Sequence, residues 1–357
     1  MKFVLFVLLL FTACSHQIEV IDELLSKDET PVKKAWVKED VVFNQDHVGK
    51  YSTPQRLKGI NDYCTKLEKS FDRYGWGNSK CSEVFWHWEK ESHDGDPLIY
   101  AVWRDKKPDP SRPITTTLIM CGVHGDEITP IKFCFDVLEM LKSITKSNPK
   151  YLENFRNKRV VVAPLVSPDS YFKRYPSRTN ANGVDINRNF PTKDWKKDAH
   201  RLWAHRYGSD KRRFPGPSAA SESETIFQVS LIDEFNPGKI ISVHSPLTML
   251  DYDGPEDFQT GGEVGNKASQ LLIQMSKKAK GYRIKNYPFF PGSLGNYAGN
   301  ERGIPTFTLE LPSSDNRRHK EYWKQFSGAI RAAIVQELNV DYGVAGEADT
   351  NDESNLN

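Results

Sequence analysis

The sequence lacks several features that would each point to a particular class of protein. After residue 11 it has no long run of apolar residues, which excludes a polytopic membrane protein. Lys and Arg number 49 against 47 Asp and Glu, a formal net charge of +2, so a binder of nucleic acid held mainly by charge is excluded. No repeat period is visible, which excludes solenoids and propellers.

The composition that is present is that of a folded protein. Of the 357 residues, 38 % are hydrophobic and 11 % are aromatic, which is enough to build a core. We expect one main domain over residues 51–340. A polar and charged segment, residues 14–50, precedes it as a tether, and an acid-rich tail, residues 341–357, follows it and is expected to be disordered.

Residues 1–13 have the pattern of an export signal. Met1-Lys2 is followed by nine apolar residues, which rise about 14 Å as a helix and are too short to span a hydrocarbon core of about 30 Å. Small residues directly before Cys14 resemble a bacterial lipoprotein signal. That resemblance implies that Cys14 becomes the lipidated first residue of the mature chain. Since Ser15 rather than Asp follows, it also points to the outer membrane of a Gram-negative bacterium, with the protein facing the periplasm and the lipid as its only membrane attachment.

Four further cysteines remain, in a compartment that would allow disulfides. Cys64 and Cys81 lie in the same polar-rich region and could pair. Cys121 lies in an apolar strand and Cys134 on a helix, where we expect two buried thiols. Four cysteines allow three connectivities, and the sequence does not choose among them.

Hydrophobic periodicity predicts strands that alternate with helices. The expected strands are 84–88, 98–103, 115–123, 159–166, 239–243 and 306–311. The expected helices begin at Thr53-Pro54, at Thr129-Pro130 and at a capping box, Ser221 with Glu224; two more cover 265–280 and 318–338. Segment 167–220 is expected to be mostly a functional loop. This order predicts an α/β fold with a mixed, mainly parallel central sheet covered by helices on both faces, and sites at the carboxyl ends of its strands.

Two of the predicted strands end in residues that can bind a metal. The strand 115–123 is followed by His124-Gly125-Asp126-Glu127, and the strand 239–243 by His244. Alone, the first motif also fits a surface turn, and a single histidine at a strand end also fits a hydrogen-bonded core residue. Together, two imidazoles and one carboxylate at neighbouring strand ends form a catalytic zinc set with a fourth position free for water.

Glu310 is a carboxylate inside an apolar strand. Phe307, Leu309 and Leu311 alternate with Thr306, Thr308 and Glu310. A buried carboxylate needs a partner or a chemical role. We expect Glu310 to be the general base for the attacking water and then the acid for the leaving nitrogen; the other interpretation is a structural ion pair.

The loop between the metal motifs carries groups suited to an anionic substrate. Arginine binds carboxylates through its planar fork. Asn187 and Arg188 are therefore expected to hold a substrate carboxylate, and Arg178 to stabilise the oxyanion that forms when water attacks a carbonyl. Taken singly, these residues also fit an ordinary polar surface loop.

The combination resembles the zinc metallocarboxypeptidase family. Four pieces occur in the family's order and with similar gaps: His124-Gly125-Asp126-Glu127, Asn187-Arg188-Asn189-Phe190, His244 and Thr308-Leu309-Glu310-Leu311. The resemblance covers roughly residues 51–338. It implies one zinc ion per chain on His124, Glu127 and His244, with Glu310 as base, Arg178 at the carbonyl, and Asn187 and Arg188 at a carboxylate.

The family also has a tyrosine on a loop upstream of its catalytic glutamate. Alignment through Gly292-Ser293, with one inserted residue, places this tyrosine at Tyr287, and Tyr297 is a competing position. The other interpretation of Tyr287 is a packing residue.

Within the family, three segments are similar to bacterial murein peptide amidases: residues 180–185, 244–247 and 287–297. That branch hydrolyses the amide between γ-D-glutamate and diaminopimelate in cell-wall peptides. The resemblance therefore implies a zinc metallopeptidase that acts on a peptide or peptidoglycan-fragment substrate. Two alternatives stay open: a general carboxypeptidase that acts on ordinary peptides, and a non-catalytic lipoprotein that binds peptides.

Overall fold

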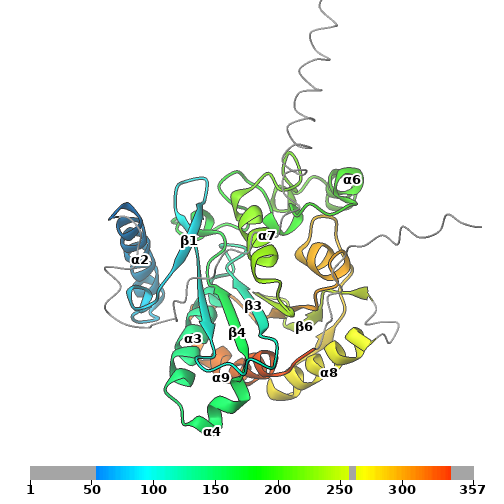
Figure 1. Ribbon diagram of the computed structural model, residues 1–357. Coiled ribbons are helices and arrows are strands. Elements are labelled where there is room, and N and C mark those ends of the chain that lie inside the picture. Colours follow the sequence, from blue (N-terminus) through cyan, green and yellow to red (C-terminus); the bar gives the residue numbers. More distant parts are fainter. Residues whose placement is uncertain (1–53, 257–262, 339–357) are drawn as a thin grey trace, which may run out of the picture. The chain divides into compact units, whose positions relative to one another are not determined.

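The computed structural model describes residues 54–256 and 263–338 (Figure 1). The predicted export signal, lipidation site, tether and acidic tail lie outside the described residues. Within the described ranges, no helix is both long enough and apolar enough to cross a lipid bilayer.

An eight-stranded mixed sheet forms the centre, in the order β1-β2-β4-β3-β5-β8-β6-β7. The strands are β1 His87–Glu91, β2 Pro97–Arg104, β3 Thr115–Cys121, β4 Lys158–Ala163, β5 Lys239–His244, β6 Met249–Tyr252, β7 Ile284–Lys285 and β8 Thr306–Glu310. The four middle strands, β4, β3, β5 and β8, run parallel, while β2 and β6 add antiparallel strands on either side. The predicted mixed, mainly parallel α/β sheet is confirmed.

Helices cover both faces of this sheet because successive strand residues point to opposite sides. In β3, Ile119 and Cys121 enter one core with α2, α3, α8 and α9, whereas Leu118 and Met120 enter a second core with α7. The helices are α2 Pro54–Tyr74, α3 Ile128–Thr145, α4 Pro149–Leu152, α5 Pro168–Tyr171, α6 Trp195–Tyr207, α7 Ser223–Phe235, α8 Glu263–Lys278 and α9 His319–Val335, with a π-helix over Gly295–Asn300.

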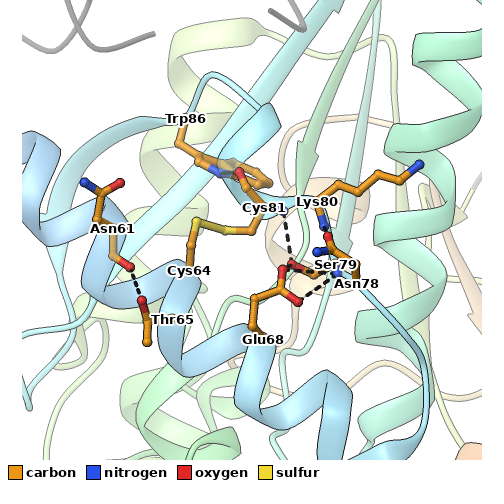
Figure 2. Close-up of a disulfide and its surroundings, with 9 residues drawn as sticks. All are labelled: Asn61, Cys64, Thr65, Glu68, Asn78, Ser79, Lys80, Cys81 and Trp86. Atoms are coloured by element: carbon orange, nitrogen blue, oxygen red, sulfur yellow. Dashed lines mark hydrogen bonds between the residues drawn. A yellow bond between two sulfur atoms is a disulfide. The ribbon is translucent and has the colours of Figure 1, made fainter. Parts of the chain in front are cut away.

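Two disulfides join helices to neighbouring elements. Figure 2 shows Cys64 of α2 bonded to Cys81, which begins a 3₁₀ turn beside Trp86. The same turn is held by Glu68, whose carboxylate accepts from the backbone N–H of Ser79 at 3.1 Å. Cys121 of β3 pairs with Cys134 of α3, so the expectation of two buried thiols there was wrong. Ile131 and Cys134 are three positions apart and therefore lie on one face of α3, and docking that face on β3 brings the two sulfurs together.

Two predicted element boundaries were wrong. The strand expected at 84–88 runs from His87 to Glu91, because Val84 and Trp86 turn inward and are buried. The helix expected at Thr129-Pro130 begins at Ile128 with Glu127 at its N-cap, and the Thr129 hydroxyl donates instead to the carbonyl of Ser313 at 2.7 Å.

The capping box was wrong as well. Helix α7 begins at Ser223 with Glu222 at its N-cap. The side chain of Ser221 donates to Glu222, and the carboxylates of Glu222 and Glu224 both accept from the amide of Asn180, at 2.7 and 3.1 Å. These acidic groups therefore fix the loop that follows Arg178 rather than the end of the helix.

Segment 167–220 holds more regular structure than expected. The 13-residue helix α6 was not predicted, since only Trp195 and Ala199 among its residues are buried and its apolar periodicity is weak. The short strands β6 and β7 were also missed.

Candidate metal centre and active site

The three predicted metal ligands come from two adjacent parallel strands. His124 and Glu127 lie in the turn between β3 and α3, and His244 is the last residue of β5, which pairs with β3 up to Cys121 opposite Val243. The turn needs Gly125, since a Cβ there would lie 2.5 Å from the backbone carbon of Ser170. The fold thus brings the three side chains to the same edge of the sheet, as parallel strand ends require.

The donor atoms of this group converge. Nδ1 of His124 lies 2.7 Å from Oε1 of Glu127, and Nδ1 of His244 lies 2.9 Å from Oε2 of the same carboxylate. The three residues are buried, and the ligand atoms that they offer lie within 4.8 Å of one another. Two neutral imidazole nitrogens and a carboxylate are the donors of catalytic zinc sites, so the residues present fit a zinc ion.

The remote nitrogens of both histidines have fixed partners. Nε2 of His124 lies 3.1 Å from Oδ1 of Asp185, and Nε2 of His244 lies 2.9 Å from the hydroxyl of Ser242. With a metal on Nδ1 of His124, the hydrogen of the neutral ring would be on Nε2, where the carboxylate of Asp185 can accept it. These outer contacts orient the rings for a metal on the Nδ1 side.

Charge in this group is balanced by an arginine. Nε and Nη2 of Arg178 donate to Oδ2 of Asp185 at 3.1 and 2.9 Å, and Nη1 donates to Oε1 of Glu127 at 3.3 Å. Burial opposes ionisation, but Arg178 and His124 hold the pKa of Asp185 well below its usual range. Burial likewise opposes ionisation of Glu127, yet His124 and His244 lower its pKa. Both acids are therefore carboxylates, and Arg178 is fixed beside the predicted ligands.

Glu310 ends β8, directly opposite His244 in the ladder between β5 and β8. Its Oε2 accepts from the backbone N–H of Leu247 at 3.2 Å, and its side chain lines the same cavity as the three predicted ligands. Burial raises the pKa of Glu310, against the opposing charge of His244. A buried carboxyl with a raised pKa beside a metal site has the properties of a general base and acid.

Asn187 and Arg188 lie in a 3₁₀ turn at the cavity wall. The side-chain oxygen of Asn187 accepts from the N–H of Leu294 at 2.9 Å. The Arg188 guanidinium stacks on the ring of Phe290, 4.4 Å from its centroid, and Nη1 donates to the carbonyl of Asn187 at 2.6 Å. In the described part of the chain, Nε of Arg188 has no hydrogen-bond partner. The guanidinium is thus held in place with donors left over.

The structure separates the two tyrosine candidates. Tyr287 is 38 % exposed and lines the cavity. Tyr297 is buried in the core against Phe190, and its hydroxyl contacts Arg302. The predicted position at Tyr287 is therefore the one that can reach a ligand in the cavity.

The cavity has a volume of about 560 Å³ and also contains groups that the sequence analysis missed. Asp251 and Asp253 line it, and Asp185, which is buried beside His124 outside the lining, was missed as well. Burial raises the pKa of Asp251 to about 7, and the charge of Asp253 adds to the shift. Two acids two residues apart in an extended segment point to the same side, so the spacing of Asp251 and Asp253 could have indicated a shared position. The strand β6 itself was not predicted.

Comparison with known proteins gives the same family as the motifs. The family described as zinc carboxypeptidase matches residues 90–332. Murein peptide amidase A of Escherichia coli K12 is 29 % identical over 231 residues, which cover 63 % of this chain and 81 % of that protein. The catalytic chain of rat carboxypeptidase N is 23 % identical over 290 residues, which cover 70 % of this chain and 62 % of that protein.

Solved structures share the fold. Bovine thrombin-activatable fibrinolysis inhibitor, in complex with tick carboxypeptidase inhibitor, matches with a TM-score of 0.55 at 20 % identity, covering 77 % of this chain and 94 % of that one. The carboxypeptidase A of Helicoverpa armigera matches with a TM-score of 0.53 at 18 % identity, covering 77 % of this chain and 72 % of that one.

Proposed function

Because the chain belongs to the zinc carboxypeptidase family and is a metallopeptidase, we propose that it hydrolyses an amide bond in peptidoglycan stem peptides, between γ-D-glutamate and diaminopimelate. The similarity to murein peptide amidase A supports this substrate class. The individual roles of the site residues stay predictions and form part of the proposal.

The observation that carries the proposal is the pairing of opposite charges in one cavity. Arg188 offers guanidinium donors without partners in the described residues, and Asp251 and Asp253 bring carboxyl groups to the same cavity. Diaminopimelate has carboxylate and ammonium groups on the same molecule, so it can pair with groups of both kinds. A neutral C-terminal residue would bring no ammonium group to Asp251 and Asp253.

In the proposed mechanism, zinc held by His124, Glu127 and His244 would activate water and polarise the amide carbonyl. Glu310 accepts the proton of the attacking water and returns it to the leaving nitrogen. Arg178, fixed by Asp185, donates a hydrogen bond to the carbonyl oxygen as it gains charge. Asn187 and Arg188 hold the carboxylate of the leaving group, and Tyr287 closes over it from the cavity rim.

The test uses zinc-loaded protein and two matched peptides. L-Ala-γ-D-Glu-meso-diaminopimelate is compared with L-Ala-γ-D-Glu-L-Lys, which keeps the ammonium but lacks the distal carboxylate. We expect release of diaminopimelate that a chelator abolishes, and slower release of lysine. Equal rates would mean that the distal carboxylate is not recognised.

A general carboxypeptidase is the second candidate, favoured by the similarity to carboxypeptidase N. It would instead release C-terminal residues from ordinary L-peptides, and an acidic wall at Asp251 would favour those that end in lysine or arginine. A mixture of such peptides is the third arm of the experiment. Chelator-sensitive cleavage in this arm alone would overturn the cell-wall proposal, and no cleavage in any arm would favour a binding lipoprotein.

We also propose that the protein is an outer-membrane lipoprotein facing the periplasm, cleaved before Cys14. The two disulfides support export, since such bonds persist in oxidising compartments. Metabolic labelling with a fatty acid checks this: wild type takes up label, and Cys14→Ala does not. Labelling that survives this substitution would contradict it.

A further inference from the structure

One segment of the chain carries an excess of positive charge. Residues 195–213 contain seven Lys or Arg against two Asp, a net charge of +5, whereas the whole chain has a net charge of +2. We define the cationic rim as the exposed side chains of Lys196, Lys197, Arg201, Lys211, Arg212 and Arg213, which come from α6 and the 3₁₀ turn Lys211–Arg213.

The fold attaches this rim to the mouth of the cavity. Arg212 and Arg213 line the cavity, and Nη2 of Arg212 donates to Asp126 at 2.8 Å, next to the predicted ligand Glu127. Helix α6 is tied to the same turn, because Trp203 donates to the carbonyl of Asp210 at 2.8 Å and its ring packs against Phe214. The rim and the cavity therefore form one continuous surface.

Half of the rim cations have a carboxylate partner among the described residues. Arg201, Arg212 and Arg213 pair with Asp198, Asp126 and Asp210. For Lys196, Lys197 and Lys211, no carboxylate in residues 54–256 and 263–338 lies within 4 Å of the ammonium nitrogen. Exposed charges of one sign beside a cleft attract and orient a ligand of the opposite sign.

Resting on the proposed function, we propose that the cationic rim binds carboxylates of neighbouring stem peptides in polymeric peptidoglycan, so that the enzyme acts on the intact wall. Each uncross-linked stem peptide carries several carboxylates, and a polymer presents them in rows that can reach the rim while one peptide occupies the cavity. A free tripeptide fills the cavity alone and does not need Lys196, Lys197 or Lys211, which lie outside the cavity lining.

The rim fits a soluble or fibrous polyanion better than a bilayer. Proteins that bind membranes from the surface combine cations with apolar side chains that enter the lipid. Among the described residues, the large apolar side chains that are exposed include none from residues 195–213. Lipid headgroups are therefore an outcome of the test rather than the proposed partner.

The test uses the full chain loaded with zinc and a charge-reversal variant, Lys196→Glu/Lys197→Glu/Lys211→Glu, which alters no residue of the cavity lining. The control, Lys106→Glu/Lys107→Glu/Lys150→Glu, makes the same charge change with exposed lysines on the loop after β2 and on α4. The end of β2 lies beside the start of β4, so this loop is at the amino ends of the parallel strands, whereas the site is at their carboxyl ends. Figure 1 shows α4 and α6 at opposite ends of the molecule.

Co-sedimentation with purified sacculi is measured at low and high salt, together with hydrolysis of the soluble tripeptide. We expect the rim variant to bind sacculi at least tenfold more weakly and to hydrolyse the tripeptide within twofold of wild type, while the control matches wild type in both. Binding of the wild type should weaken with salt and with removal of the stem peptides from the sacculi.

Three results would overturn the inference: equal binding by the rim variant, equal binding to stripped glycan, or tighter binding to anionic phosphatidylglycerol vesicles than to sacculi. The failure of the proposed function is separate. If the wild type binds sacculi through the rim but does not hydrolyse the tripeptide, the inference about the rim stands and the proposed substrate is refuted.

Discussion

Oδ1 of Asp185 lies 3.1 Å from Nε2 of His124, on the side of the ring that faces away from the predicted metal. The other oxygen of the same carboxylate accepts two hydrogen bonds from Arg178. One buried acid therefore contacts a predicted ligand and fixes the position of the predicted oxyanion donor. In the proposed mechanism, Asp185 would couple metal binding to carbonyl recognition.

Asp185→Asn should weaken zinc binding. The amide is uncharged and cannot accept from both Arg178 and His124 as strongly, and the loss of such an outer partner costs about 10- to 100-fold in metal affinity. Competition with a chromophoric zinc chelator measures the dissociation constant. Asp62→Asn on the exposed face of α2 is the control and should match wild type. A zinc affinity of Asp185→Asn within twofold of wild type would contradict this role.

Phe290→Leu should raise KM with little change in kcat. Its ring holds the Arg188 guanidinium in place, and loss of a cation–π contact costs about 1 kcal/mol, roughly fivefold in binding. Phe290→Tyr keeps the ring and should restore the wild-type KM. Steady-state kinetics on the tripeptide measure both constants. A fall in kcat alone, or no rescue by tyrosine, would show that Phe290 does not act through substrate binding.

Glu224→Gln should change the pH dependence of stability. Burial raises the pKa of Glu224 to about 7, and the charges of Asp169 and Glu222 add to the shift. At pH values between the ordinary pKa of a glutamate and 7, Glu224 keeps its proton in the folded state and loses it in the unfolded state. The wild type therefore loses stability as pH rises through this range, by up to about 3 kcal/mol. The glutamine variant lacks this loss.

Denaturant unfolding at pH 5 and pH 8 measures the effect. The stability of Glu224→Gln relative to wild type should increase from pH 5 to pH 8. Glu89→Gln, at an exposed position of β1, is the control for the loss of one carboxyl group. The same difference for Glu224→Gln at both pH values would refute a buried, protonated Glu224.

Cys64→Ser/Cys81→Ser should lower the free energy of unfolding by about 3 kcal/mol, because this disulfide restricts the unfolded chain over a separation of 17 residues. Urea unfolding compares the variant with wild type under oxidising conditions. With a reductant present, the wild type loses this disulfide too, and the two proteins should differ less in their free energy of unfolding. A variant as stable as oxidised wild type would mean that the bond contributes nothing.

Much of the site could be predicted because its position follows from strand order. His124, His244 and Glu310 each follow or end a parallel strand, and strands with apolar patterning are visible in the sequence. Their convergence then follows from the geometry of a parallel sheet. The chemistry of the residues also indicated Glu127 and the polar loop, and the family resemblance added Tyr287.

The missed residues depend on features that periodicity does not report. Asp185 reaches His124 through the path of an irregular loop, and Asp251 lies on β6, a strand of four residues. The pairing of Cys121 with Cys134 depends on how α3 docks on β3. Helix α6 was missed because a mostly exposed helix has little apolar pattern to detect.

The central claim is that zinc chemistry at this site depends on Glu310, and comparison of wild type with Glu310→Ala tests it most directly. Bound zinc and tripeptide affinity are measured for both proteins, and release of diaminopimelate is followed under the same conditions. The account predicts one zinc per chain and similar tripeptide binding in both, with turnover lost in the variant. Turnover by Glu310→Ala within tenfold of wild type would contradict it.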